Sequence, residues 1–260
     1  MISLYGYRNP MYEAFYGFRK SPFRLTPDPT FLFLSPNHRE ALAHLLFGVE
    51  QGDGIVVLTG EIGAGKTTLL RTVLKDLGSN TTIAYIFNPA LSSVELLQSI
   101  NGDLGLRASS TSKKELTDEL NGFLLAQMRQ GRRVIVIIDE AQNLKASVLE
   151  QLRLLTNLET EQEKLLHIVL VGQPELRDIL ARPELVQINQ RVTLRWHLAA
   201  LNTKETVAYI RHRLRIATEG RDPSLFSLAA LRFIQNASSG IHRSINICLI
   251  YTSPSPRDRG

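Results

Sequence analysis

Cysteine and long hydrophobic runs are what this 260-residue sequence has least of. The single cysteine, Cys248, excludes an internal disulfide, which indicates a reducing compartment. No run approaches the ~18 consecutive apolar residues that a membrane-spanning helix needs, and the N-terminus lacks the apolar stretch of a secretory signal peptide. We therefore expect the chain as given to stay in the cytoplasm.

Repeats, low-complexity segments and a strong charge bias are absent too. The 30 basic and 25 acidic residues are spread along the chain, and the net charge of +5 permits anionic partners without requiring them. Solvated helix faces explain this charge better than a binding surface does. The length allows one large core, or one core with a small satellite domain.

A glycine-rich stretch carries the strongest positive signal, because it fits the P-loop pattern GxxxxGK[ST] at every fixed position. A buried strand is expected before it, over residues 55–59, and a helix after it, up to Gly78. A chance loop of glycines is the alternative, which both flanks disfavour. The predicted nucleotide-binding residues are Gly60, Glu61, Ile62, Gly63, Ala64, Gly65, Lys66, Thr67 and Thr68.

The chemistry of ATP with Mg²⁺ explains that spacing. Backbone N–H groups must close around phosphate oxygens, and side chains at the glycine positions would crowd that approach. Lys66 would reach the β- and γ-phosphates, and the Thr67 hydroxyl would ligate Mg²⁺.

Two acids follow the next strongly apolar strand, at residues 134–138. Carboxylates at the end of a buried strand require a stabilising partner, because burying charge is costly unless a cation or hydrogen bonds offset it. We expect Asp139 to hold Mg²⁺ together with Thr67, and Glu140 to orient and deprotonate the attacking water. The structural alternative is a pair of exposed acids at a strand-to-loop junction.

A further buried strand over residues 165–171 ends before Gln173. That side chain either touches the γ-phosphate or the lytic water, or is a plain turn residue, and the sequence leaves both open. A fifth strand is expected at residues 190–196. Alternating strands and helices of this length predict an α/β fold in which helices cover both faces of a parallel sheet, a three-layer αβα domain.

The ends of the chain differ in character from this domain. We predict an irregular aromatic arm over residues 1–34, the αβα domain over 35–198, a small helical lid over 199–250, and a tail over 251–260 that is either foreign or disordered. The arm's phenylalanines either attach it to the rest of the protein, which we favour, or line a pocket for the base.

Taken together, these motifs resemble those of AAA+ ATPases, and more narrowly the general secretion pathway protein A (ExeA-like) family. The resemblance spans residues 11–246 and rests on more than the P-loop. Its most specific parts are Asp139-Glu140-Ala141-Gln142-Asn143-Leu144 and Gly172-Gln173-Pro174-Glu175-Leu176, supported by Pro22-Phe23-Arg24, His38-Arg39-Glu40-Ala41-Leu42 and Asn189-Gln190-Arg191-Val192.

The resemblance implies an ATPase with Gln173 as first sensor, Arg191 as an arginine finger acting on a neighbouring subunit of a homo-oligomer, and Arg243 as second sensor. His242 departs from the family, which usually has proline before that arginine, and this departure predicts a different start for the lid helix. Full-length members of the family that the chain resembles often carry a membrane segment and a peptidoglycan-binding domain after the ATPase.

Two functions of different class follow. One is an ATP-hydrolysing factor for a cell-envelope machine, such as type II secretion or a pilus. The other is a DNA-binding ATP switch similar to transposition target-selection ATPases, for which the dense basic run of Arg211, Arg213 and Arg215 is the candidate contact. An inactive nucleotide-bound scaffold is disfavoured because Glu140 is present.

Overall fold

The computed structural model describes residues 10–251 apart from 27, 52–53, 79, 88–89, 162 and 222–224. The chain divides into two compact units. Pro36–Ala199 forms the first, here called the αβα unit. The segments on either side, Met1–Ser35 and Ala200–Gly260, form the second, here called the helical unit.

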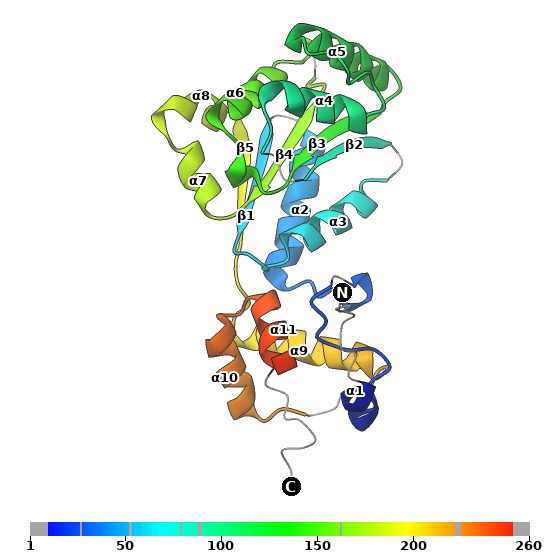
Figure 1. The fold of residues 1–260 in the computed structure, drawn as a ribbon, viewed down its shortest axis with the longest axis vertical. Coiled ribbons are helices and arrows are strands. Elements are labelled where there is room, and N and C mark those ends of the chain that lie inside the picture. Colours follow the sequence, from blue (N-terminus) through cyan, green and yellow to red (C-terminus); the bar gives the residue numbers. More distant parts are fainter. Residues whose placement is uncertain are drawn as a thin grey trace, which may run out of the picture. The chain divides into compact units, whose positions relative to one another are not determined.

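Within the described residues the αβα unit contains a sheet of five parallel strands in the order β2-β3-β4-β1-β5 (Figure 1). This confirms the predicted parallel sheet. The strands are β1 (Ile55–Gly60), β2 (Thr81–Ile86), β3 (Arg133–Ile138), β4 (His167–Gly172) and β5 (Val192–Leu198).

Burial along each strand follows its place in the sheet. The inner strands β1 and β4 are buried at every residue, as central parallel strands must be. The edge strand β5 instead alternates, with exposed side chains at every second position.

Helices cover both faces of the sheet. Helices α2 (Pro36–Gln51) and α3 (Lys66–Asp76) pack on one face, while the other carries the larger core, built with α4 (Ser93–Asp103), α5 (Lys113–Arg129), α6 (Ala146–Leu155), α7 (Glu175–Leu180) and α8 (Val186–Gln190). Single 3₁₀ turns lie at Ala141–Asn143 and Pro183–Leu185. The three-layer prediction is therefore confirmed.

Some predicted boundaries were wrong. The fifth strand begins at Val192 rather than at residue 190, because residues 186–190 form helix α8 and Arg191 closes it. The fourth strand begins at His167, after Leu165 and Leu166. The dipeptide Asn88-Pro89 predicts a turn after the second strand, and it lies outside the described residues.

The helical unit contains α1 (Pro10–Tyr16), a 3₁₀ turn at Pro29–Phe31, α9 (Thr203–Ala217), α10 (Leu228–Ser238) and α11 (His242–Tyr251). The prediction that the N-terminal arm is irregular was wrong for residues 10–16, which form helix α1. Helix α9 begins with a capping box, in which Asn202 accepts from the N–H of Glu205 and Glu205 accepts in return from the N–H of Asn202. No helix among the described residues is long and apolar enough to cross a membrane.

The arm packs against these C-terminal helices. Phe18, Phe23 and Phe31 are buried in one core with apolar residues of α9, α10 and α11. The backbone N–H of Arg19 also donates to the Ala217 carbonyl over 2.9 Å. These three rings thus attach the arm, the alternative favoured from sequence, whereas Phe15 is 63% exposed.

Arg213 breaks up the basic run that suggested DNA binding. It is buried, its Nε donates to the Pro22 carbonyl, and its Nη1 donates to the Tyr209 hydroxyl over 2.7 Å. Its guanidinium also lies 4.9 Å from the centroid of the Phe31 ring. Assigning Arg213 to a nucleic-acid surface was therefore wrong, because this side chain ties the arm to α9, while Arg211 and Arg215 are exposed.

Candidate functional site

The glycine-rich turn joins the carboxyl end of β1 to the start of α3, and the structure gives a reason for glycine at each of residues 60, 63 and 65. Gly63 and Gly65 have φ angles of 82° and 101°, in the left-handed region that favours glycine. A Cβ on Gly60 would lie 2.9 Å from the Leu198 carbonyl oxygen. At Gly60 the obstacle is therefore the neighbouring strand, a different reason from the phosphate crowding expected from sequence.

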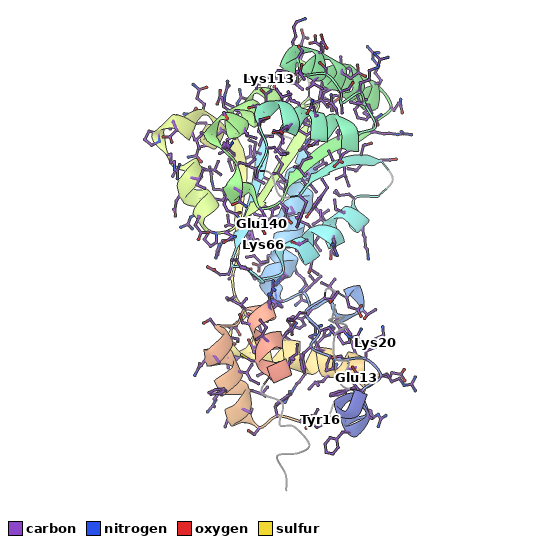
Figure 2. The ribbon with its side chains drawn as sticks, in the orientation of Figure 1. Glu13, Tyr16, Lys20, Lys66, Lys113 and Glu140 are labelled. Atoms are coloured by element: carbon purple, nitrogen blue, oxygen red, sulfur yellow. The ribbon has the colours of Figure 1, made fainter. Side chains whose placement is uncertain are left out.

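Lys66 is the first residue of α3, directly after this turn, and is 7% exposed. Its Nζ donates to the carbonyls of Gly60, over 2.7 Å, and Glu61, over 3.0 Å. Burial lowers the pKa of the Lys66 ammonium, and the charges of Glu140 and Asp139 oppose that shift. Figure 2 shows Lys66 and Glu140 at the same end of the sheet.

Thr67 and Asp139 meet at the first turn of α3. Asp139 follows β3 and is 1% exposed. Its Oδ2 accepts a hydrogen bond from the Thr67 hydroxyl over 3.1 Å, and its Oδ1 accepts from the N–H of Glu140 over 2.9 Å. A hydroxyl and a carboxylate side by side are the hard oxygen ligands that Mg²⁺ takes from proteins.

The carboxylate of Glu140 is held by two side-chain amides. Its Oε2 accepts from Gln142 Nε2 over 2.6 Å and from Gln173 Nε2 over 3.4 Å. The Oε1 of Gln142 accepts in turn from the backbone N–H of Gln173 over 3.0 Å. Glu140 itself has φ 53°, a left-handed conformation that is uncommon for a residue with a side chain and typical of functional sites.

Gln173 is therefore more than a plain turn residue. It follows the carboxyl end of β4, and its side chain reaches Glu140 from the neighbouring strand. The structure brings together Lys66, Thr67, Asp139, Glu140 and Gln173 at the carboxyl ends of the strands.

Arg191 lies at the opposite end of the strands. It closes helix α8 just before β5, whose Val192 pairs with Ile55 at the start of β1. The five residue steps of β1 from Ile55 to Gly60 correspond to roughly 17 Å. Arg191 is therefore remote from the P-loop of the same chain.

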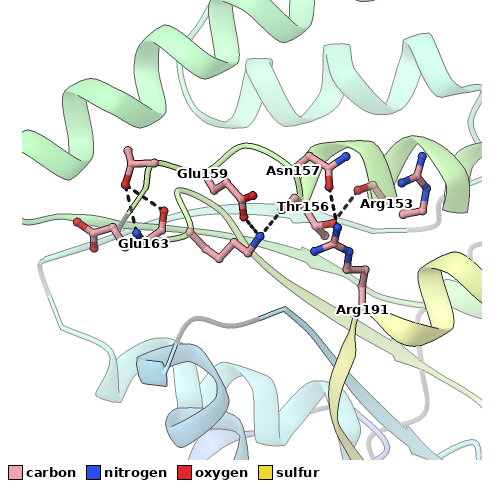
Figure 3. Close-up of polar contacts among 8 residues, drawn as sticks. Arg153, Thr156, Asn157, Glu159, Glu163 and Arg191 are labelled. Carbon is pink, nitrogen blue, oxygen red and sulfur yellow. Dashed lines mark hydrogen bonds and ion pairs between the residues drawn. The ribbon is translucent and has the colours of Figure 1, made fainter.

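The Arg191 guanidinium contacts the loop that follows α6 (Figure 3). Its Nη2 donates to Asn157 Oδ1 over 3.2 Å. The loop that carries Asn157 is tied by Lys164, which donates to the Thr156 carbonyl over 3.3 Å and pairs with the Glu159 carboxylate. Arg191 is only partly exposed, so this contact orients it toward the end of α6.

Comparison with known proteins identifies the family. A sequence profile described as an AAA domain matches residues 49–180, half of the chain. The chain belongs to the AAA domain family. As an AAA domain protein it is a nucleotide-binding P-loop NTPase.

This AAA domain protein is also similar to "General secretion pathway protein A" of Aeromonas hydrophila. The two are 46% identical over 238 residues, which is 91% of this chain and 43% of that relative. The chain thus spans less than half the length of the curated relative it matches. The resemblance to the ExeA-like family inferred from the motifs is confirmed.

Solved structures share the fold at low sequence identity. The ORC2 protein of Aeropyrum pernix, in its ADPNP–ADP complexes, has a TM-score of 0.66 and 20% identity, covering 90% of this chain and 66% of that one. Cdc6p of Pyrobaculum aerophilum has a TM-score of 0.60 and 17% identity, covering 88% and 65%. These likenesses show the AAA+ fold.

The residues of this AAA domain fit a nucleotide with its metal. The turn is free of side chains at Gly63 and Gly65, and a Cβ on Gly65 would come within 3.2 Å of His38 Nε2. A buried ammonium, a hydroxyl and a carboxylate surround this turn. That donor set suits phosphate oxygens and a hard divalent cation.

Three residues of the site were missed from sequence. Tyr85 donates its hydroxyl to Asp139 Oδ2 over 2.8 Å, Gln142 bridges Glu140 and Gln173, and the Nε2 of the buried His38 lies 3.1 Å from the Ala64 carbonyl oxygen. Gln142 and His38 lie in the stretches that carry the family resemblance, so the sequence contained a signal that could have identified them as site residues.

The predicted second sensor, Arg243, lies in the first turn of α11, in the helical unit, and is exposed.

Proposed function

We propose that this chain hydrolyses ATP, with Mg²⁺, at the carboxyl edge of its sheet. The observation that carries the proposal is the hydrogen bond between Thr67 and Asp139, which places a hydroxyl and a buried carboxylate beside a P-loop whose lysine is also buried. Because burying these charged groups is costly, their assembly in one place supports a ligand of complementary charge.

The residues divide the work between binding and chemistry. Backbone N–H groups of residues 60–67 and the Lys66 ammonium bind the phosphates. Thr67 and Asp139 hold the magnesium ion, which when bound neutralises phosphate charge. Glu140 accepts the proton of the attacking water, and the amides of Gln142 and Gln173 hold its carboxylate in place. Gln173 also serves as the first sensor of the γ-phosphate.

We propose further that Arg191 acts on the nucleotide of a neighbouring copy in a homo-oligomer. Its distance from its own P-loop and its orientation by Asn157 support this role. Guanidinium charge meeting phosphoryl charge in the transition state is worth about 10³–10⁵ in rate. Arg243 is the proposed second sensor.

The cellular role we propose is service to a cell-envelope machine of the general secretion pathway, with the ATPase in the cytoplasm. The 46% identity to General secretion pathway protein A supports it. The DNA-binding alternative loses its main support because Arg213 is buried against Pro22 and Tyr209.

The experiment that tests ATP binding compares Lys66→Ala with Lys75→Ala. Both lysines lie on α3, but Lys75 is exposed near the end of that helix. Titration with a fluorescent ATP analogue in Mg²⁺ should show loss of binding for Lys66→Ala and wild-type affinity for Lys75→Ala. Equal affinity of the two variants would contradict the proposed site.

The cellular role has its own test. In a secretion-competent bacterium lacking its own protein of this family, a full-length version carrying this domain should restore export of a secreted enzyme, whereas the same protein with Glu140→Gln should not. Restoration by both would mean that hydrolysis is not needed for secretion.

A further inference from the structure

The Tyr85 hydroxyl donates a hydrogen bond to Asp139, and the proposed mechanism of hydrolysis gives this contact no role. We propose that Tyr85 is a positioning residue that fixes the Asp139 carboxylate for magnesium, so that the magnesium affinity of the site depends on a hydroxyl carried by an edge strand. This inference rests on the proposed function, because it names a further determinant of that same site.

The register of the sheet explains how the two side chains meet. Tyr85 pairs with Ile137 in the parallel ladder between β2 and β3, and the N–H of Asp139 donates to the Ile86 carbonyl over 3.0 Å. Side chains alternate between the faces of a strand, so Ile137 and Asp139 project to the same face as Tyr85. The long phenol spans the remaining step along the strand and reaches Asp139 Oδ2.

The Tyr85 backbone is fixed as well. Its strand β2 lies at the edge of the sheet, and the N–H of Tyr85 donates to Asp103 Oδ2 of helix α4 over 2.9 Å. The residue is thus held at its backbone by one carboxylate while its hydroxyl holds another. This arrangement gives the hydroxyl a defined position.

Asp139 depends on such donors because its carboxylate is almost fully buried. In the described structure Oδ1 accepts from the Glu140 N–H, and Oδ2 accepts from Thr67 and Tyr85. Thr67 is also a proposed metal ligand, so orientation of Oδ2 falls to Tyr85. A tyrosine hydroxyl ordinarily has a pKa of about 10, so it carries its proton and can donate at neutral pH.

Tyr85→Phe removes this donor and keeps the ring. Loss of a hydrogen-bond partner of a metal ligand costs about 10–100-fold in metal affinity or activity. We therefore expect the Mg²⁺ concentration that half-saturates nucleotide binding and turnover to rise about 10–100-fold. Nucleotide affinity measured in EDTA should stay at the wild-type value, a result that general damage to the P-loop would not give.

The matched control is Thr82→Val, which removes a hydroxyl from the same strand at a site where it bonds Gln127 rather than Asp139. Its Mg²⁺ dependence should equal that of wild type. Thermal unfolding without Mg²⁺ checks that each variant is folded, and Tyr85→Leu, which also lacks the hydroxyl, replaces Tyr85→Phe if the latter does not fold.

A double-mutant cycle tests whether Tyr85 acts through Asp139. In an Asp139→Asn background, Tyr85→Phe should change the Mg²⁺ dependence less than twofold, because the group it positions has been altered. If wild type shows no Mg²⁺-dependent nucleotide binding, both the proposed function and this inference fail. If wild type shows it and Tyr85→Phe matches wild type, or if the effect persists undiminished with Asp139→Asn, the inference alone is wrong.

Discussion

Replacing Arg213 by methionine separates a structural role from a surface role for the basic run on α9. Methionine keeps much of the apolar length of the side chain but makes none of the hydrogen bonds to Pro22 and Tyr209. It also removes the guanidinium that lies over the Phe31 and Tyr209 rings, 4.9 Å and 5.5 Å from their centroids.

The magnitude follows from these contacts. Hydrogen bonds to charged groups contribute about 1.5–3 kcal/mol each, and a desolvated cation over an aromatic ring about 2 kcal/mol. Release of the buried charge offsets part of the loss. We expect the helical unit to lose about 2–4 kcal/mol, which for a unit of this size lowers its melting temperature by about 10 °C or more.

Differential scanning calorimetry measures this, with Arg211→Met as the matched control. Arg211 lies two residues away on the same helix and is exposed, so its replacement should change stability by less than about 0.5 kcal/mol. If the two variants have the same melting temperature, Arg213 does not stabilise the packing of the arm on α9, and the reasoning from its burial is refuted.

Two further predictions concern assembly and pH. Arg191→Ala and Glu140→Gln proteins should each fail to hydrolyse ATP. Their mixture should regain hydrolysis, because an interface between the two variants pairs an intact Glu140 with an intact Arg191. If oligomers shown to contain both variants recover no activity, Arg191 does not act in trans. The pKa of His212 is lowered, chiefly by burial and further by Arg213 and Arg215. Below its unfolded pKa of about 6.5 the unfolded chain therefore binds more protons than the folded one, so stability should fall as pH drops from 7 toward 5. Chemical denaturation at several pH values should show a smaller fall for His212→Gln, and an equal fall would rule out His212 as the cause.

The core and the main site residues were predictable because their signals are local. Five consecutive apolar β-branched residues before Asp139 predict a buried strand, and the glycine spacing around Lys66 predicts its own turn. Arg213 was also within reach, since it lies three residues after Ile210 and one before Leu214, on the apolar stripe of α9.

Other features depend on pairing that a single sequence does not contain. The contact between Tyr85 and Asp139 joins residues 54 positions apart and requires the register of β2 on β3. The start of β5 was misplaced because residues 186–190 form one short helical turn before the strand, without a capping side chain to mark it. The burial of the N-terminal phenylalanines among C-terminal helices likewise required the tertiary structure.

ATP turnover by Glu140→Gln, measured beside its nucleotide affinity, tests the central claim most directly. The substitution keeps the shape of the side chain and its contacts with Gln142 and Gln173 while removing the base. We predict Mg²⁺-dependent hydrolysis by the wild-type protein, and a rate about 10²–10⁴-fold lower for Glu140→Gln at unchanged ATP affinity. Hydrolysis by Glu140→Gln at the wild-type rate would contradict the assignment of this edge of the sheet as the catalytic site.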